Sequence, residues 1–143
     1  MTTITGTRAV TARSAAYWTA TALVTAELAV GGIWDVLRIS QVRDVVEHLG
    51  YPAYFLVLLG VWKVLGALAL LAPRLPLLKE WAYAGVIFTD TGAIVSHLTV
   101  GYELAELGFL IPLAGLTVLS WALRPEPRRL PTVPGGSAVP AAR

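Results

Sequence analysis

The stretch YFLVLLGVWKVLGALALLA, residues 54–72, decides the fold of this chain. It contains one charged residue, Lys63, and lies between Pro52 and Pro73. A helix of about 20 apolar residues is long enough to cross roughly 30 Å of hydrocarbon. Proline disrupts a helix interior, so the two prolines set its limits. We therefore predict a membrane-spanning helix over residues 54–72.

The flanking sequence contains three further segments of similar length, at residues 14–36, 80–98 and 104–123. The segment 80–98 is less apolar, but it begins with Trp81 and Tyr83, and these residue types favour the membrane–water interface. The sequence thus predicts an all-α fold, a bundle of four transmembrane helices.

The amino-acid composition is typical of a protein embedded in a lipid bilayer. Apolar residues make up 56% of the sequence and the mean hydropathy is +0.67. Charged residues make up 14%, against roughly 25% in soluble domains. The absence of cysteine excludes disulfides, thiol relays, iron–sulfur clusters and thiolate metal sites. The basic residues flank the apolar segments instead of forming one patch, so we expect a lipid bilayer as the partner and no nucleic acid.

The Lys and Arg residues near the segment ends predict the topology. Two of them, Arg38 and Arg43, lie on one side of the predicted membrane. Seven lie on the other side: Arg8, Arg13, Arg74, Lys79, Arg124, Arg128 and Arg129. Basic residues are concentrated in cytoplasmic loops. This asymmetry predicts cytoplasmic termini and a multi-pass protein of the bacterial plasma membrane.

The remaining segments are shorter or more polar. Residues 1–13 form a Thr-rich stretch that we interpret as a polar tail, and residues 14–124 form the predicted membrane domain. Residues 40–50, SQVRDVVEHLG, have apolar side chains at helical spacing opposite charged ones, which predicts an amphipathic surface helix. Residues 125–143 contain five prolines and predict a disordered tail.

Three charged residues lie at the centres of three different predicted helices: Glu27, Lys63 and Asp90. An ionised group at the bilayer centre costs about 2.5–3.5 kcal/mol, so these groups should face inward and meet. We expect Lys63 to pair with Glu27 or Asp90, which leaves one carboxylate either protonated or stabilised by all three groups. The set is a candidate catalytic site that handles protons or polarises a ligand. The alternative interpretation is a structural ion pair that fixes helix register.

Further titratable residues extend from this centre. Tyr83, Asp90 and His97 are spaced by seven residues, so they share one helix face. A second group near the predicted outer surface comprises His97, Asp35, Glu103 and Glu106. We interpret Tyr83 and this outer group as candidate proton-relay or ligand-contact residues, with ordinary solvated helix ends as the alternative. The spacing of these residues predicts no metal site.

The run from Gly50 to Leu98 resembles the DoxX-like family of small four-helix membrane proteins. The similarity rests on Gly-Tyr-Pro at residues 50–52, Trp-Lys at 62–63, Lys-Glu-Trp-Ala-Tyr-Ala-Gly at 79–85 and Ser-His at 96–97. It extends from about residue 17 to residue 124. The resemblance implies a four-helix bundle in the bacterial cytoplasmic membrane. It also implies an association with oxidative stress and with quinone-linked redox systems, because its relatives include a subunit of a thiosulfate:quinone oxidoreductase.

Three function classes follow from these observations. The first is a protein accessory to a quinone-linked redox or oxidative-stress system, with no intrinsic cofactor, a buried charged pocket for an apolar molecule such as a quinone, and a redox partner subunit. The second is a cofactor-independent membrane isomerase, cyclase or epoxide-opening enzyme that uses a buried carboxylic acid. The third is a structural or transport protein, which would act as a homodimer.

Overall fold

The computed structural model describes residues 3–101 and 104–130, with side chains placed for residues 10–101 and 107–130. In these ranges the chain forms helices and no strand, which confirms the predicted all-α class. The elements are α1 (Thr3–Leu37), α2 (Ser40–His48), α3 (Ala53–Leu71), α4 (Pro76–Val100), α5 (Leu104–Leu123) and a short 3-10 helix, η1 (Glu126–Arg128).

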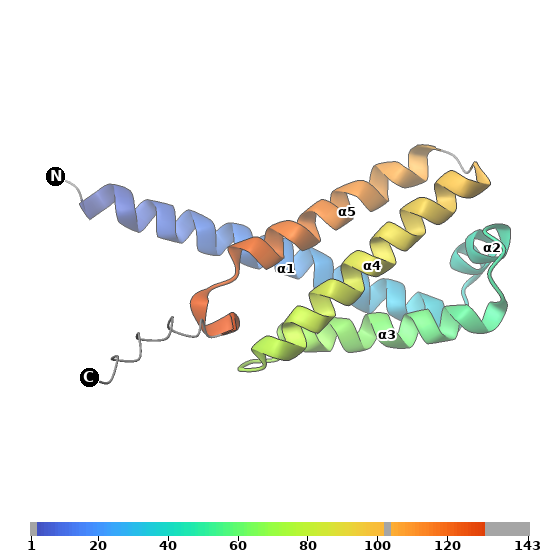
Figure 1. Cartoon of the computed structure of the whole chain (residues 1–143), viewed down its shortest axis with the longest axis horizontal. Helices are drawn as coiled ribbons and strands as arrows, with labels where there is room; N and C mark the ends of the chain where they lie inside the picture. Colours follow the sequence, from blue (N-terminus) through green and yellow to red (C-terminus); the bar gives the residue numbers. More distant parts are fainter. Residues whose placement is uncertain (1–2, 102–103, 131–143) are drawn as a thin grey trace, which may run out of the picture.

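The four long helices pack as a bundle (Figure 1). Helix α3 runs back along the second half of α1, and α5 crosses α1 while packing against α4. Short α2 lies beside the end of α1 and the start of α3. The largest apolar core cluster joins α1, α3 and α4 and comprises Val24, Leu28, Ala67, Leu70, Tyr83 and Val86.

The bundle carries large apolar side chains outside and several hydroxyl groups inside. Trp62 is 65% exposed and Phe88 is 75% exposed, whereas Thr117 and Ser120 are fully buried. A soluble protein exposes few contiguous large apolar patches. Helices α1 (over Val10–Leu37) and α3 are long and apolar enough to span a membrane by length and composition. Leu107–Leu123 of α5 is a shorter apolar segment.

Turn residues explain where the helices end. Gly50 follows α2 with φ +84°, and Gly101 follows α4 with φ +71°. Glycine adopts this left-handed conformation without steric cost. Helix α4 begins at Pro76, four residues before the predicted start, because proline is well suited to the first turn of a helix.

Two segments differ from the predicted tails. Helix α1 begins at Thr3, although we predicted a polar tail over residues 1–13. An established helix gains one hydrogen bond per added residue, so it extends into a polar segment that contains no proline. Residues 125–130 include η1 instead of starting a disordered tail, because Arg128 and Arg129 bond to backbone oxygens of the bundle. Residues 131–143 lie outside the described residues.

Candidate functional site

The centre of the bundle holds Lys63 between two carboxylates of α1. Its Nζ atom lies 3.5 Å from Glu27 Oε1 and 3.2 Å from Asp35 Oδ2. The contact with Asp35 is a second ion pair of the same ammonium group. Gly31 lies between the two acids on the same face of α1, and a Cβ added there would meet Lys63 Nζ at 3.4 Å. The same Cβ would lie 3.0 Å from Glu27 Oε1, so glycine at this position leaves space for the ion pair of Glu27 and Lys63.

A close approach of α1 to α3 positions this ion-pair group. A Cβ added to Gly60 would lie 2.5 Å from the backbone oxygen of Gly32, and one added to Gly32 would lie 2.9 Å from that of Gly60. Real Cβ atoms do not tolerate these distances, so both positions require glycine. The two backbones are thus locked in one register, which fixes Lys63 opposite Glu27 and Asp35.

Asp90 of α4 is a third carboxylate near this group. Its side chain is only 6% exposed, and its Oδ2 atom has no hydrogen-bond partner within residues 10–101 and 107–130. It interacts electrostatically with Glu27 and Lys63 without forming a salt bridge to Lys63 in that part of the chain. Two carboxylates thus contact one ammonium group and a third lies near it, one acid more than we predicted from the three midplane residues.

The additional acid is Asp35, which the sequence analysis assigned to the outer group with His97. The pairing of Lys63 with Glu27 agrees with our prediction, whereas the alternative partner, Asp90, makes no direct contact. The sequence prediction missed Asp35 because residue depth alone places it two helical turns from Glu27. The gap at Gly31 allows one ammonium group to reach both acids.

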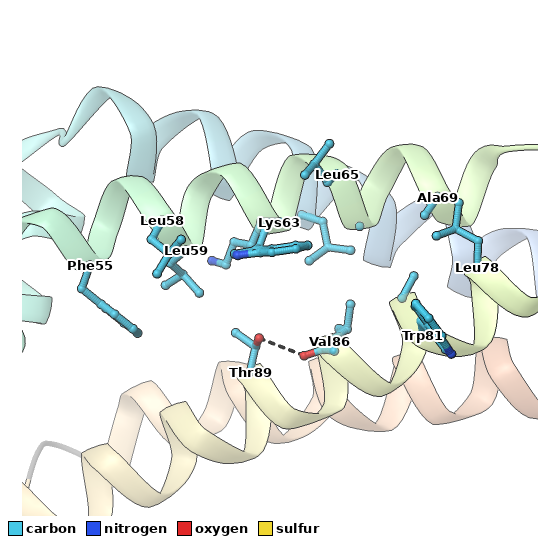
Figure 2. Close-up of a pocket in the computed structure, with 15 residues that line it drawn as sticks. Phe55, Leu58, Leu59, Lys63, Leu65, Ala69, Leu78, Trp81, Val86 and Thr89 are labelled. Carbon is cyan, nitrogen blue, oxygen red and sulfur yellow. Dashed lines mark hydrogen bonds between the residues drawn. The ribbon is translucent and has the colours of Figure 1, made fainter.

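An apolar cavity of about 420 Å³ lies between α3 and α4 (Figure 2). Phe55, Leu59 and Trp62 contribute to its α3 wall, and Trp81 and Gly85 contribute to its α4 wall. Lys63 is the only charged residue among those that line it in the described chain. The volume is in the range of small-molecule sites, which are mostly apolar with few polar groups. The sequence predicted a pocket at the charges but gave no sign of its position between α3 and α4.

Tyr83 belongs to a different polar group. Its hydroxyl lies 2.7 Å from Ser120 Oγ, which in turn lies 2.7 Å from Thr21 Oγ1. All three side chains are buried, and together they join α4, α5 and α1. From its spacing, Tyr83 was predicted to lie with Asp90 and His97, and neither Ser120 nor Thr21 was predicted as a partner. The sequence feature that could have indicated this group is the presence of hydroxyl residues at equal depth on three apolar helices.

His97 is buried at the far end of α4, with its Nδ1 atom 2.8 Å from the carbonyl oxygen of Ala93. Of its predicted partners, Glu103 lies outside the described residues, as does the side chain of Glu106. The grouping of His97 with these two glutamates therefore stays a prediction, whereas Asp35 pairs with Lys63. Within that same part of the chain, no group of three His, Asp or Glu residues has the geometry of a metal site.

A basic group closes the opposite end of the bundle. Lys79, which is 1% exposed, donates hydrogen bonds to the carbonyl oxygens of Ala69 (3.0 Å) and Leu70 (2.6 Å). Burial, followed by the positive charges of Arg128 and Arg124, lowers the pKa of Lys79 to about 8. Lys79 was predicted only as a topology signal, but it also ties the start of α4 to the end of α3.

Arg124 links α5 to α4 at the same end. Its Nη2 atom lies 2.6 Å from Glu80 Oε1, and Trp121 Nε1 donates a hydrogen bond to Glu80 Oε2 at 2.9 Å. The guanidinium carbon of Arg124 also lies 5.1 Å from the ring centre of Tyr83, within range of a cation–π contact. These contacts close the basic end, while the cavity lies between α3 and α4.

Comparison with known proteins supports the resemblance found in the sequence. No curated protein and no solved structure matches the chain. A family model described as the DoxX-like family matches residues 19–123, from the first half of α1 to the last residue of α5. This match and the apolar helices α1 and α3 identify a membrane-associated protein. The chain belongs to the DoxX-like family.

Proposed function

We propose that this protein spans the bacterial plasma membrane with four helices and binds a quinone in the cavity between α3 and α4, as an accessory to a quinone-linked redox or oxidative-stress system. The observation that carries the proposal is an apolar cavity of about 420 Å³ with Lys63 in its wall. A ring compound with carbonyl oxygens matches this combination, because its ring needs an apolar site and its oxygen needs a positioned donor.

Charge distribution supports the proposed topology. Helices α1 and α3 have the length and composition of spanning helices, and α4 and α5 pack against each other and the other two. Helix α4 carries more charge than a lipid-exposed helix would, but the side chain of Asp90 is buried inside the bundle. The basic group at Lys79 and Arg124 supports a cytoplasmic location for this end, because cytoplasmic segments are rich in Lys and Arg. Both termini are then cytoplasmic.

Lys63 is the residue that would polarise the ligand. Glu27 and Asp35 hold its ammonium group from the α1 side, while the residue lines the cavity on the other side. An ammonium proton could donate a hydrogen bond to a quinone carbonyl, and Asp90 could supply or accept a proton nearby. Side chains of this kind do not carry electrons. We therefore assign electron transfer to a redox partner subunit.

The test is titration of the purified protein in detergent with a soluble menaquinone analogue. Gly85 lines the cavity and a Cβ there meets nothing within 4 Å, so Gly85→Leu fills the site without displacing a neighbour's backbone. Gly92 is equally open on the same helix but does not line the cavity, so Gly92→Leu is the matched control. We expect saturable binding that Gly85→Leu weakens at least tenfold and Gly92→Leu leaves unchanged. Absence of saturable binding to the folded native protein would contradict the proposal.

A second function is favoured by the side chain of Asp90. A buried carboxyl oxygen without a hydrogen-bond partner in the described chain is suited to act as a proton donor to a lipid-soluble substrate. Asp90 fits this role better than Glu27, because Glu27 already pairs with Lys63. This alternative is a cofactor-independent isomerase, cyclase or epoxide-opening enzyme.

Turnover separates the two functions. The enzyme would convert a lipid-soluble epoxide or polyene without a partner, and Asp90→Asn would abolish this turnover while leaving substrate binding intact. The accessory protein would bind quinone and show no turnover alone. Asp90→Asn has nearly the same volume as the native residue, so a loss of activity would reflect loss of the acid.

A further inference from the structure

A second apolar groove, of about 390 Å³, lies between α1 and α3 and shares no lining residue with the cavity between α3 and α4. Its α1 wall includes the small residues Ala22 and Ala26, and its α3 wall includes Leu68 and Leu71. The hydroxyls of nearby Thr residues on α1 are bonded to the backbone of that helix. The groove therefore presents an almost entirely apolar surface.

The length of the groove matches one leaflet of a bilayer. On α1 it extends from Trp18 to Ala29, which at 1.5 Å per residue is about 16 Å. Half of the hydrocarbon core is about 15 Å. Trp18, at one end, belongs to a residue type that favours the headgroup level. A single acyl chain from one leaflet would thus fill the groove from its headgroup end to the bilayer centre.

Arg128 of η1 is located at the Trp18 end of this groove. Its guanidinium carbon lies 4.7 Å from the Trp18 ring centre, and its Nη1 atom donates hydrogen bonds of 3.2 Å to the Tyr17 hydroxyl and to the Leu70 carbonyl oxygen. Tyr17 and Leu70 directly precede Trp18 and Leu71, which line the groove end. The arginine thus bridges the two helices where the groove begins.

The charge of Arg128 differs from that of Arg124 in one respect. Arg124 is compensated by Glu80, whereas within the described side chains no carboxylate forms an ion pair with Arg128. The side chain is half-buried, so it remains accessible from the membrane surface. A phosphate group would supply the missing negative charge, and its oxygens match the geometry of a guanidinium group.

We infer that the groove binds one anionic phospholipid of the cytoplasmic leaflet, with an acyl chain between α1 and α3 and the phosphate on Arg128. The anionic lipids of that leaflet attract basic residues at the membrane surface. The inference rests on the membrane-spanning part of the proposed function. It does not depend on a quinone in the cavity between α3 and α4.

The experiment measures binding of phosphatidylglycerol and phosphatidylcholine with identical chains to the full-length protein in a nonionic detergent. We expect the native protein to bind phosphatidylglycerol at least tenfold more tightly. Arg128→Gln should reduce this preference to less than threefold. Arg129→Gln is the matched control, because it removes the same charge one residue away. The Arg129 side chain bonds to the carbonyl oxygens of Ala122 and Arg124. This variant should retain the preference for phosphatidylglycerol. Equal affinity for both lipids, or an equal loss in the two variants, would overturn the inference.

Filling the groove tests the acyl chain separately. Ala26→Phe should weaken the binding of both lipids at least tenfold. Leu23 is exposed on α1 and lines neither the groove nor the cavity, so Leu23→Phe should leave lipid binding unchanged. Glycerol phosphate, which lacks acyl chains, should not bind measurably. Lipid-like affinity for glycerol phosphate, or full lipid binding by Ala26→Phe, would overturn the inference. The inference would also be overturned if the native protein were a dimer in lipid-free detergent and Ala26→Phe dissociated this dimer. Thermal unfolding midpoints identify any misfolded variant.

Discussion

The contacts that α3 makes with α1 differ from those it makes with α4. Toward α1, the backbones meet at Gly32 and Gly60, where even a methyl group has no space. Toward α4, the helices leave a cavity of about 420 Å³, and a Cβ added to Gly85 would meet nothing within 4 Å. Glycine thus allows close packing at the level of Gly32 and Gly60, beyond the end of the groove between α1 and α3, and leaves open space beside Gly85.

This difference indicates that α1 and α3 form a rigid scaffold and that α4 forms the other wall of a binding site. Lys63 belongs to both interfaces, since it pairs with acids of α1 and lines the cavity beside α4. A precisely held polar group on one wall of an apolar cavity is the usual arrangement of a ligand site. The following predictions test the division between scaffold and site, from the largest effect to the smallest.

Lys63→Met should have the largest effect on stability, a loss of about 3 kcal/mol in the free energy of unfolding. Removing one partner of a buried ion pair leaves the other charge uncompensated. The measurement is unfolding by sodium dodecyl sulfate in mixed micelles. Adding Glu27→Gln and Asp35→Asn to Lys63→Met should recover most of the loss. A triple variant as unstable as the single one would show that packing, not charge, causes the effect.

Gly60→Ala should reduce the free energy of unfolding by about 2 kcal/mol, because the methyl group forces α1 and α3 apart. Gly85→Ala should change it by less than 1 kcal/mol, or raise it, because alanine favours a helix and the space is open. Unfolding curves of the two variants compare the two interfaces directly. Similar losses in both would remove the distinction between scaffold and site.

Tyr83→Phe should reduce the free energy of unfolding by about 1 kcal/mol, the typical net contribution of one buried hydrogen bond. The variant removes the contact to Ser120 but leaves the Ser120–Thr21 contact in place. Because this group lies apart from the cavity lining, we expect quinone affinity to change less than twofold. A tenfold change in affinity would place Tyr83 in the ligand site instead.

Lys79 should make a smaller contribution to the stability of the protein, and this contribution should depend on pH. Its pKa in the folded chain is about 8, below its ordinary value of 10.5, so the unfolded chain binds more protons between these two pH values. Stability therefore rises with pH in this window. We expect the thermal midpoint of the native protein to increase relative to that of Lys79→Met between pH 8 and 10. A constant or decreasing difference would contradict the proposed burial of a charged amine.

The sequence was informative about the helices and about which charges must face inward. Apolar length and proline borders predicted α3 closely, and the cost of charge in lipid predicted that Lys63 would meet Glu27 or Asp90, of which Glu27 forms the ion pair. Residue depth could not predict Asp35 as a partner of Lys63, because that contact depends on the space beside Gly31. Pairings of this kind are determined by the relative rotation and offset of two helices.

The cavity could not be predicted for a related reason. Its lining residues, including Leu59 and Trp81, are of the types that face lipid in any apolar helix, so their sequence pattern is the same with or without a cavity. The contact of Arg128 with the bundle was also missed, since its surrounding sequence is rich in proline.

Tryptophan quenching by a menaquinone analogue would test most directly whether the ligand binds between α3 and α4. Two of the five tryptophans, Trp62 and Trp81, line this cavity, and the other three are Trp18, Trp34 and Trp121. One variant keeps only the cavity pair and a second keeps only the other three, with phenylalanine at the replaced positions. We predict saturable quenching in the first variant and only weak, non-saturable quenching in the second. Saturable quenching confined to the second variant would contradict a ligand site between α3 and α4.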